Sequence, residues 1–488
     1  MLYDNLMECG LFGGRIFLPF FVCNLLFFIL SFTVFGVRHP QRRRQDMYRR
    51  LFGFILFGGL VAFSAGTAAS DEYHYTNLII GDRASGMGGA YTAVADDATG
   101  LYYNPAGVAY SAGRNISASV NAYYNTEKTY KSVIGGNGWI RTSSSLLPNY
   151  FGVVQPVGKF RIGISYAVPE SIMENQDQTF NNLALSNQVA NPNVDIKSYI
   201  INFNNESNTY NFGPSIAMEL NSKLSAGLTL YYYQKRTMFI LNQILKTDRI
   251  DPTISAGGPG YEWSNVKRLS TEWGFRPVLG FMLTPVDNVS VGLALSKVFI
   301  EGSNTMWQVS QRAQNISPGE VDYINLPDGQ TTTNQTSKYP TQISLGVAWF
   351  PTQSLLLTAD VNYVTKVNEQ DVVVNNAMYG LRPEAKAVTN IALGGEYYVS
   401  KSLAMRAGLY TNYANTPQIV SGVKDQNEHI DMYGGTLSLS HFTRNTSVTL
   451  GGGYTYGAGK TQIIGDSLKI QDAESKGWMF FLSSSYSY

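Results

Sequence analysis

The sequence has 488 residues, of which 44% are hydrophobic and only 15% charged, and its formal net charge at pH 7 is +1. This balance excludes a nucleic-acid-binding protein, which needs an excess of basic residues to neutralise phosphates. Glycine (47), tyrosine (32) and phenylalanine (25) are abundant, which is unusual for a soluble enzyme but typical of β-structure with aromatic girdles. Both cysteines, Cys9 and Cys23, lie near the start, so the rest of the chain offers no disulfide framework or thiolate metal site.

Residues 47–69 have the layout of a secretory signal peptide. Two arginines form its basic start, residues 51–63 form its apolar core, and small residues follow. We expect cleavage after Ala68 or Ala69. The apolar core is too short for a membrane-spanning helix, which needs about 20 residues.

The preceding residues, 1–46, contain a second apolar stretch, residues 16–37, followed by a run of three arginines. This piece is open to two interpretations: a transmembrane anchor, or a mistaken N-terminal extension of a protein whose translation starts at Met47. We prefer the second interpretation. The mature protein is then expected to begin near Ser70 and to contain no cysteine.

Residues 70–112 include an unusual run of small residues, GMGGAYTAVADDATGLYYNPAG, over residues 86–107. Asp97 can cap a short helix over residues 98–103, and Asn104 followed by Pro105 suits the N-cap and first turn of another. The glycines permit tight reversals and close backbone approach. A disordered tail would not carry so many apolar residues, namely Met87, Tyr91, Val94, Leu101, Tyr102 and Tyr103. The segment is therefore predicted to fold as a small helix-and-turn unit.

From about Asn115 the chain alternates apolar and polar residues with a period of two. The pattern is clear over residues 116–122, 355–363 and 447–456. Such alternation places one face of each strand in an apolar medium and the other in a polar one. No stretch of this region is apolar enough for a transmembrane helix.

The connections between these strands sort into two kinds. Six are tight, near residues 156–158, 221–222, 285–288, 351–353, 400–401 and 444–445. Seven are longer and polar, near residues 127–145, 169–197, 237–270, 300–336, 366–388, 413–429 and 457–475. Thirteen connections join fourteen strands, and short turns at one end with long loops at the other are the pattern of bacterial outer-membrane barrels. A soluble β-sandwich would alternate as well, but has no reason to sort its loops in this way.

We therefore predict an all-β fold, a 14-stranded antiparallel transmembrane β-barrel over residues 113–488, with both termini in the periplasm of a Gram-negative-type cell. In the last strand, one face carries Trp478, Phe480, Leu482, Tyr486 and the final Tyr488. A terminal aromatic residue resembles the sorting signal that the barrel assembly machinery reads, and it equally suits an aromatic girdle.

On the register set by the apolar face, several charged side chains are predicted to point into the lumen. They are Arg161, Glu219, Arg276, Asp360, Glu396 and Arg406. Charges of both signs could line a water-filled pore, or they could hold an internal plug by hydrogen bonds. The small unit at residues 70–112 favours the plug, because a segment of its size can fit inside a fourteen-stranded lumen. We refer to residues 70–112 as the hatch.

In the hatch the chain resembles the FadL/TodX family of outer-membrane channels for long-chain fatty acids and aromatic hydrocarbons. The resemblance rests on Gly86, Met87, Gly88, Gly89 and Ala90, on Asp96 and Asp97, and on Asn104, Pro105, Ala106 and Gly107. The later runs NFGP (residues 211–214) and LSAGL (residues 224–228) are similar too. In plan the resemblance covers nearly all of the chain after the signal peptide.

The resemblance implies a plugged multi-pass barrel, surrounded by outer-membrane lipid, that takes a hydrophobic small molecule from outside. It also implies sideways release into the membrane through a kinked third strand. Gly163 and Pro169 are the candidates for that lateral opening, although no kink motif matches residue by residue. The family's ligand-binding residues lie in variable loops, so they are not transferred; here residues 169–197 and 237–270 are expected to shape ligand access.

Two other functions match parts of the sequence. PorV-like accessory barrels of a secretion system carry a very similar start, so a role as a protein-interaction partner is the main alternative. An enzyme is not expected, because the region after the signal peptide holds only His74, His429 and His441, and a lipase group of His441 with Ser438 or Ser440 is weakly supported. We predict no catalytic residues, no metal, no cofactor and a monomer.

Overall fold

The computed structural model describes residues 73–487 except 112, 188–190, 250–259, 318–319, 326–328, 369, 375–376, 383, 424–425 and 464–467. The predicted extension (1–46), the predicted signal peptide (47–69) and Tyr488 lie outside these residues. Among the residues that are described, no helix is both long and apolar enough to cross a membrane.

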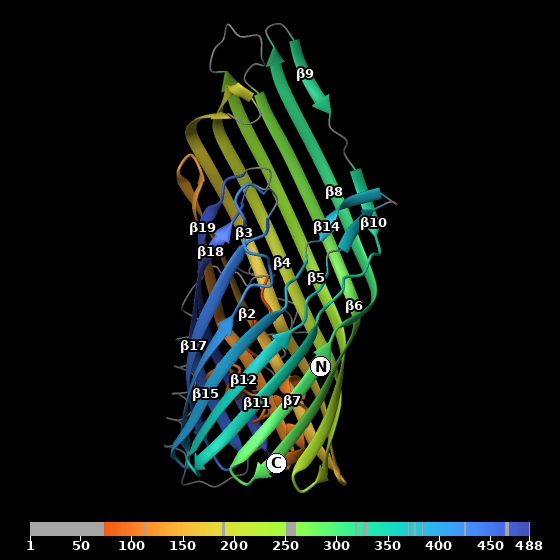
Figure 1. Cartoon of the computed structure of the whole chain (residues 1–488), viewed down its shortest axis with the longest axis vertical. Helices are drawn as coiled ribbons and strands as arrows, with labels where there is room; N and C mark the ends of the chain where they lie inside the picture. Colours follow the sequence, from red (N-terminus) through yellow and green to blue (C-terminus); the bar gives the residue numbers. More distant parts are fainter. Residues whose placement is uncertain are drawn as a thin grey trace, which may run out of the picture. The chain divides into compact units, whose positions relative to one another are not determined.

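The described residues form fourteen antiparallel passes of a closed barrel (Figure 1). The first six are β1 (Asn115–Ile134), β2 (Asn137–Val157), β3 (Phe160–Asn187), β4 (Asn191–Asn221), β5 (Leu224–Arg249) and β6 (Gly260–Val286). The seventh comprises β7 (Val289–Lys297) and β8 (Phe299–Ser317), and the eighth comprises β9 (Glu320–Asn325), β10 (Gly329–Thr333) and β11 (Thr341–Thr352). The last six are β12 (Leu355–Val364), β15 (Val388–Ser400), β16 (Leu403–Asn412), β17 (His429–Phe442), β18 (Thr446–Thr461) and β19 (Gln471–Ser487).

The barrel closes because β1 pairs with β2 on one side and with β19 on the other. A separate hairpin of β13 (Gln370–Val374) and β14 (Ala377–Arg382) lies between β12 and β15 in the chain. The predicted count of fourteen strands is confirmed, and so are the positions of all six tight turns.

The predicted loops at the other end were too long. Most of residues 127–145, 169–197, 237–270 and 300–336 continue as strands, so that β3 to β6 and β8 extend well beyond β12 and β15 (Figure 1). These stretches are rich in Asn, Gln, Ser and Thr on both faces, and the apolar–polar alternation that marks a membrane-embedded strand therefore disappears although the backbone pairing continues.

The alternation within the membrane-embedded part is confirmed by burial. Outward side chains such as Ile162, Leu357 and Leu437 are exposed where lipid would surround them, while inward neighbours such as Ser165 and Thr358 are buried. Along β19, Trp478, Phe480 and Tyr486 are exposed on the predicted face, and Phe481 points inward and is buried.

An arginine on the outward face should destabilise the barrel. Val361 lies on β12 with 42% of its side chain exposed. We expect Val361→Arg to lower the free energy of unfolding by about 2–4 kcal/mol, because the guanidinium would enter the hydrocarbon near the bilayer midplane. Denaturant unfolding in lipid vesicles measures this, with Val361→Leu as the control; equal stability of the two variants would contradict the assigned face.

The hatch lies inside the lumen. It contains three short helices, α3 (Asp82–Gly86), α4 (Gly100–Tyr103) and η1 (Gly107–Tyr110). Helix α3 packs against β16 to β19, and η1 packs against β3 to β6, so the unit reaches across the barrel. A buried apolar cluster joins hatch residues such as Met87 and Tyr91 to wall residues Met282, Ala348 and Leu356.

Candidate functional site

The barrel wall carries glycine where the hatch comes closest. Three neighbouring pairs face the lumen: Gly227 with Gly280, Gly292 with Gly346, and Gly394 with Gly408. A Cβ atom at any of the six would overlap an atom of the hatch, mostly of its main chain. We call these six residues the glycine belt. Sequence reasoning missed it, although six glycines at inward-facing strand positions were a signal that could have been read.

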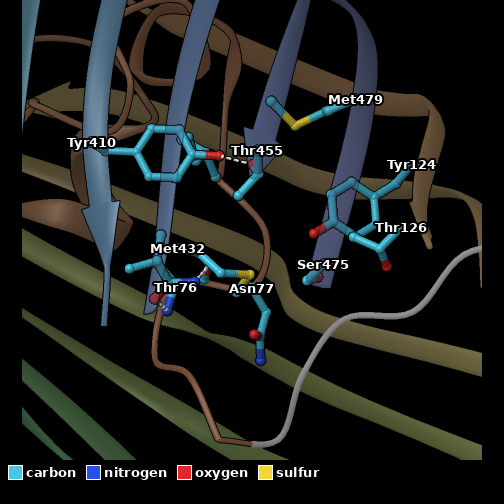
Figure 2. A pocket seen from close by; sticks show the side chains of 11 residues that line it. Thr76, Asn77, Tyr124, Thr126, Tyr410, Met432, Thr455, Ser475 and Met479 are labelled. Atoms are coloured by element: carbon cyan, nitrogen blue, oxygen red, sulfur yellow. Dashed lines mark hydrogen bonds between the residues drawn. The ribbon is translucent and has the colours of Figure 1, made fainter. Parts of the chain in front are cut away.

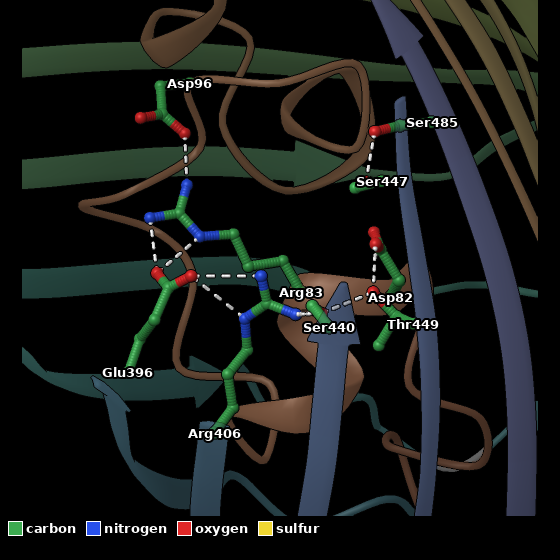
Figure 3. A network of polar contacts seen from close by, with 9 residues as sticks. All are labelled: Asp82, Arg83, Asp96, Glu396, Arg406, Ser440, Ser447, Thr449 and Ser485. Carbon is green, nitrogen blue, oxygen red and sulfur yellow. Dashed lines mark hydrogen bonds and ion pairs between the residues drawn. The ribbon is translucent and has the colours of Figure 1, made fainter. Parts of the chain in front are cut away.

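Charged side chains connect α3 to the wall (Figure 3). The carboxylate of Glu396, on β15, is fully buried and accepts from Arg83 Nε of the hatch at 2.8 Å. Its other oxygen accepts from Arg406 Nε and Nη2, on β16, at 3.1 and 3.0 Å. Arg83 also pairs with Asp96 of the hatch at 2.6 Å. This arrangement, the Glu396 cluster, joins the hatch to two strands, and its two guanidiniums are balanced by two carboxylates.

Two further contacts position the hatch backbone. Asp360 Oδ2, on β12, accepts from the N–H groups of Tyr91 and Thr92 at 2.9 and 2.8 Å. Asn104 Nδ2 donates to the carbonyls of Thr92 and of Phe281 on β6 at 2.8 and 3.1 Å, and its Oδ1 accepts from Ala106 N at 3.2 Å. The Asn-Pro-Ala turn therefore holds the hatch against β6 by hydrogen bonds of the Asn104 side chain.

The other predicted hatch residues pack against their surroundings or allow the chain to reverse direction. Gly88 and Gly89 have φ angles of +64° and +85°, which side chains other than glycine rarely adopt. Met87 is fully buried, and the carbonyl of Gly86 accepts from Thr436 Oγ1 on β17 at 3.1 Å. Pro105 fits against Gly227, and Gly107 lies against the carbonyl of Ala95.

The six predicted lumen charges occupy two levels. Asp360, Glu396, Arg406 and Arg276 lie at the hatch, the last with its guanidinium 4.8 Å from the ring centre of Tyr102. Arg161 and Glu219 follow the inward register but lie beside the β2–β3 and β4–β5 turns, where Glu219 is exposed. Gly163 faces Leu101 of α4, and its lack of a side chain makes room for that leucine.

The environment of Asp97 predicts that packing of the hatch depends on pH. Burial, then the neighbouring charges of Asp82 and Asp96, raise the pKa of Asp97 from 3.8 to about 6, against the opposing effect of Arg83. A raised pKa means that Asp97 binds its proton more tightly when the hatch is packed than when it is displaced, so protonation stabilises the packed hatch. This contribution is fully present below about pH 4 and is lost as pH rises through about 6. We expect lower single-channel conductance at pH 5 than at pH 7.5.

The variant Asp97→Asn tests this directly. Asparagine keeps an Oδ1 acceptor for Thr99 N, which Asp97 now binds at 2.7 Å, but it does not titrate. Its conductance in planar bilayers should be low at both pH values. A pH dependence that survives in Asp97→Asn would assign the titration to another group.

Before α3 the chain crosses the lumen as an irregular segment, residues 73–80, which sequence reasoning did not single out. Thr76 exchanges hydrogen bonds with the Asn412 side chain at 3.3 and 2.9 Å. On the other side, Leu78 N donates to the carbonyl of Pro169 on β3 at 3.2 Å, and Asn149 Nδ2 on β2 donates to Ile79 O at 3.1 Å. This crossing segment therefore joins β16 to β2 and β3.

A pocket of about 120 Å³ lies between the hatch and the wall. We call it the hatch pocket. Leu78, Ile79, Tyr102 and Tyr103 form its hatch side, and Pro169 borders it. Its wall side has hydrogen-bonding groups from Arg276, Ser296, Gln342, Ser344, Asn362, Asn390 and Thr411, and it also includes Val278, Ala294, Ile391, Ala392 and Tyr410. The pocket thus combines apolar and aromatic surface with hydrogen-bonding groups.

A second, smaller pocket of about 20 Å³ lies at the crossing segment near β16 to β19 (Figure 2). Hydroxyl and amide groups of Asn77, Thr126, Thr455 and Ser475 surround it, and Tyr410, which borders both pockets, hydrogen-bonds Thr455 at 2.7 Å. Ile79, Met432 and Met479 also belong to the lining. A space of this size, with several hydrogen-bonding groups around it, suits a single water molecule.

The wall next to the hatch pocket is interrupted. Strands β2 and β3 pair at Ser143 with Glu174, and their pairing resumes only at Tyr150 with Ala167. In this described part of the wall, residues 144–149 therefore have no ladder partner on β3. Register also shifts between β3 and β4 at Pro169, which lacks a backbone donor. Leu146 and Met173 are exposed at this interruption. We call it the β2–β3 gap.

Comparison with known proteins agrees with this architecture. A sequence profile described as "Outer membrane protein transport protein (OMPP1/FadL/TodX)" matches residues 79–456. No curated protein matches the sequence.

Among solved structures, a FadL homologue of Pseudomonas aeruginosa is 16% identical, with a TM-score of 0.59, over 85% of this chain and 99% of its own. The toluene transporter TodX of P. putida is 16% identical, with a TM-score of 0.56, over 86% and 99%. The toluene transporter TbuX of Ralstonia pickettii is 14% identical, with a TM-score of 0.54, over 85% and 100%. These likenesses concern the fold. By its profile match, the chain belongs to the FadL/TodX family of outer-membrane proteins, which are transport channels for hydrophobic compounds rather than enzymes.

Proposed function

We propose that this protein carries long-chain fatty acids, in preference to uncharged hydrocarbons, across the outer membrane. The observation that carries the proposal is Arg276 in the hatch pocket. Its Nη1 is buried and has no hydrogen-bond partner among the described residues, and its contact with Ser296 Oγ is long, at 3.5 Å. A carboxylate would satisfy this guanidinium, whereas a hydrocarbon would leave its Nη1 unpaired.

The apolar part of the ligand has a place on the opposite side of the pocket. Leu78, Ile79 and the two tyrosine rings of α4 offer it contact, as apolar surface does in most ligand sites. The pocket of about 120 Å³ is smaller than the roughly 300–1,000 Å³ of typical ligand pockets, so binding requires the crossing segment, residues 73–80, to shift.

We propose that the fatty acid leaves sideways through the β2–β3 gap. Pro169 borders both the hatch pocket and this gap, and its carbonyl holds Leu78 of the crossing segment. A shift of residues 73–80 would therefore enlarge the pocket and release a contact at the gap in one movement. Leu146 and Met173 offer an apolar surface toward the lipid at that point.

The experiment compares hexadecanoate with hexadecanol, which has the same chain length and no charge. Arg276→Gln should weaken hexadecanoate binding about tenfold, as expected for the loss of a charge-assisted hydrogen bond, and leave hexadecanol binding unchanged. Arg236→Gln, on the neighbouring strand but exposed, is the control. Equal losses for both ligands would argue against carboxylate recognition at this pocket.

A further inference from the structure

The tall part of the barrel wall, where β3 to β6 rise beyond β12 and β15 (Figure 1), carries a ladder of hydrogen-bonded side chains. Asp177 on β3, Asn202 on β4 and Asn242 on β5 are successive partners in the strand register. Asn202 Nδ2 donates to Asp177 Oδ1 at 2.6 Å, and Asn242 Nδ2 donates to Asn202 Oδ1 at 2.9 Å. Trp263 Nε1, on β6, donates to Asn242 Oδ1 at 2.6 Å. We call these four side chains the outer ladder.

The outer ladder faces away from the lumen and is ordered although water reaches it. Ile201, the neighbour of Asn202 in the chain, points inward and is buried, so the ladder lies on the opposite face of the sheet. Both amides use one donor and one acceptor within the ladder, which fixes their orientation and leaves each a second N–H and a second lone pair. Groups that are already ordered lose little entropy when a partner binds.

An apolar row borders the outer ladder on the side farther from the membrane. Ile200 on β4, Ile244 on β5 and Trp263 on β6 are register neighbours on the outward face, and all three are half-buried. Charge is balanced here, because Asp177 is the acidic member of the ladder and Lys267 lies one row nearer the membrane. Amides beside aromatic and apolar surface suit a saccharide, whose hydroxyl groups both donate and accept and whose ring faces present C–H groups.

The height of the outer ladder indicates where such a saccharide comes from. Lower on the same face, Tyr232 on β5 contacts Phe275 on β6 edge to face, and these exposed rings mark the aromatic girdle. Asn242 follows Tyr232 by ten residues on β5. At about 3.3 Å per residue and a strand tilt of about 40°, the ladder stands about 25 Å above the girdle. The surface is continuous with the lipid-facing wall, and at this height it meets the sugars of a neighbouring glycolipid.

We propose that the outer ladder and its apolar row bind the saccharide head group of an outer-leaflet glycolipid of the lipopolysaccharide type. A sugar ring lies with its C–H face on Trp263, and its hydroxyl groups bind the amides of Asn202 and Asn242. The acyl chains of the same molecule stay in the leaflet beside the lower part of these strands. The site lies outside the barrel, so the proposal does not depend on which molecule the channel carries.

The test titrates the full-length protein, in detergent micelles, with two glycolipids and measures the one-to-one complexes by native mass spectrometry. One is lipopolysaccharide with a complete core oligosaccharide, and the other is lipid A, which has similar acyl chains and phosphates but lacks the core. The wild type should bind the first about tenfold more tightly, as expected for a few added hydrogen bonds. Asn242→Ala and Trp263→Ser should each abolish most of this preference and leave lipid A binding unchanged.

Asn304→Ala is the matched control, because Asn304 is an exposed asparagine on the outward face of β8, nearer the membrane than the ladder. It should keep the wild-type preference. Heat-modifiable migration on gels confirms that each variant is folded. If the wild type bound lipid A as tightly as lipopolysaccharide, or if Asn242→Ala and Trp263→Ser behaved like Asn304→Ala, the site would be refuted.

Hydroxyl-radical footprinting locates the bound sugar on the wild-type protein in phosphatidylethanolamine vesicles. Oxidation of Trp263 should be several-fold slower when the vesicles contain lipopolysaccharide than when they contain lipid A. Trp273, lower on the same face of β6, is the internal reference and should be oxidised equally in both. Equal oxidation of Trp263 in the two kinds of vesicle would contradict the proposed position. Equal protection by free core oligosaccharide at the same concentration would overturn the glycolipid assignment in favour of a soluble saccharide.

Discussion

Replacing Glu396 with leucine should open the barrel to ions. The carboxylate is fully buried between Arg83 of the hatch and Arg406 of the wall, and it is the group that lets these two cations lie together. Removing one partner of a buried ion pair costs about 3–5 kcal/mol, because an uncompensated charge remains buried. Here two guanidiniums would face each other, and the movement that separates them is displacement of the hatch.

Single-channel recording in planar bilayers measures the result, with frequent open events expected for Glu396→Leu and rare ones for the wild type. Glu219→Leu is the control, since that inward carboxylate lies at the periplasmic rim and is exposed. The double variant Glu396→Leu/Arg406→Leu should be closed more often than the single variant, because only one guanidinium then remains. If Glu396→Leu, the double variant and Glu219→Leu all gave closed traces like the wild type, the Glu396 cluster would not be what holds the hatch.

Filling one position of the glycine belt should displace the hatch by steric overlap alone. A Cβ at Gly394 would lie 2.8 Å from Met87 Cβ and 2.8 Å from the Met87 carbonyl oxygen. Overpacking of this kind costs about 1–3 kcal/mol. For Gly394→Val we therefore expect hatch amides to exchange with deuterium about 10- to 100-fold faster, since 1.4 kcal/mol corresponds to a factor of ten.

The adjacent residue is a matched control. Gly395 lies on the same strand but faces outward, and the nearest atom to its Cβ would be Leu357 Cδ2 at 3.6 Å, an ordinary contact. Gly395→Val should leave exchange in residues 82–110 at the wild-type rate. If both valines accelerated exchange equally, general strand weakening and not contact with the hatch would be the cause.

The barrel was predictable because its constraints are local. Lipid on one side and the lumen on the other impose an alternation such as that of residues 355–363, and the six tight turns mark where each pair of strands reverses. The upper strands escaped prediction because Asn202 and Asn242 on the outer face and Gln243 on the inner face are all polar, so no alternation signals pairing there. The register shift at Pro169 depends on strand pairing that a single segment does not encode.

The hatch was predictable as a unit but not in its attachments. Asp97 and Asn104 do form local side-chain-to-backbone bonds. They are not the helix caps that we expected, because α4 and η1 begin later, with Thr99 and Ala106 at their N-cap positions. The sequence left open whether the inward charges line a water-filled pore or hold a plug. It could not show that Asp360 and Glu396 contact the hatch, because only the fold brings together residues some 270 and 310 positions apart. The sequence did not indicate that Arg83 pairs with Glu396, because a lone arginine in a short helix is ordinarily solvated.

The hatch is covalently tied to the strand that closes the barrel. Only residues 111–114 lie between the end of η1 and the start of β1, and four extended residues span at most about 14 Å. A hatch that leaves its seat therefore stays near the periplasmic rim, at an effective concentration of the order of millimolar relative to that seat. Reclosure is then a first-order step that does not depend on how much protein the membrane contains, so each transport cycle can end without help from a periplasmic partner.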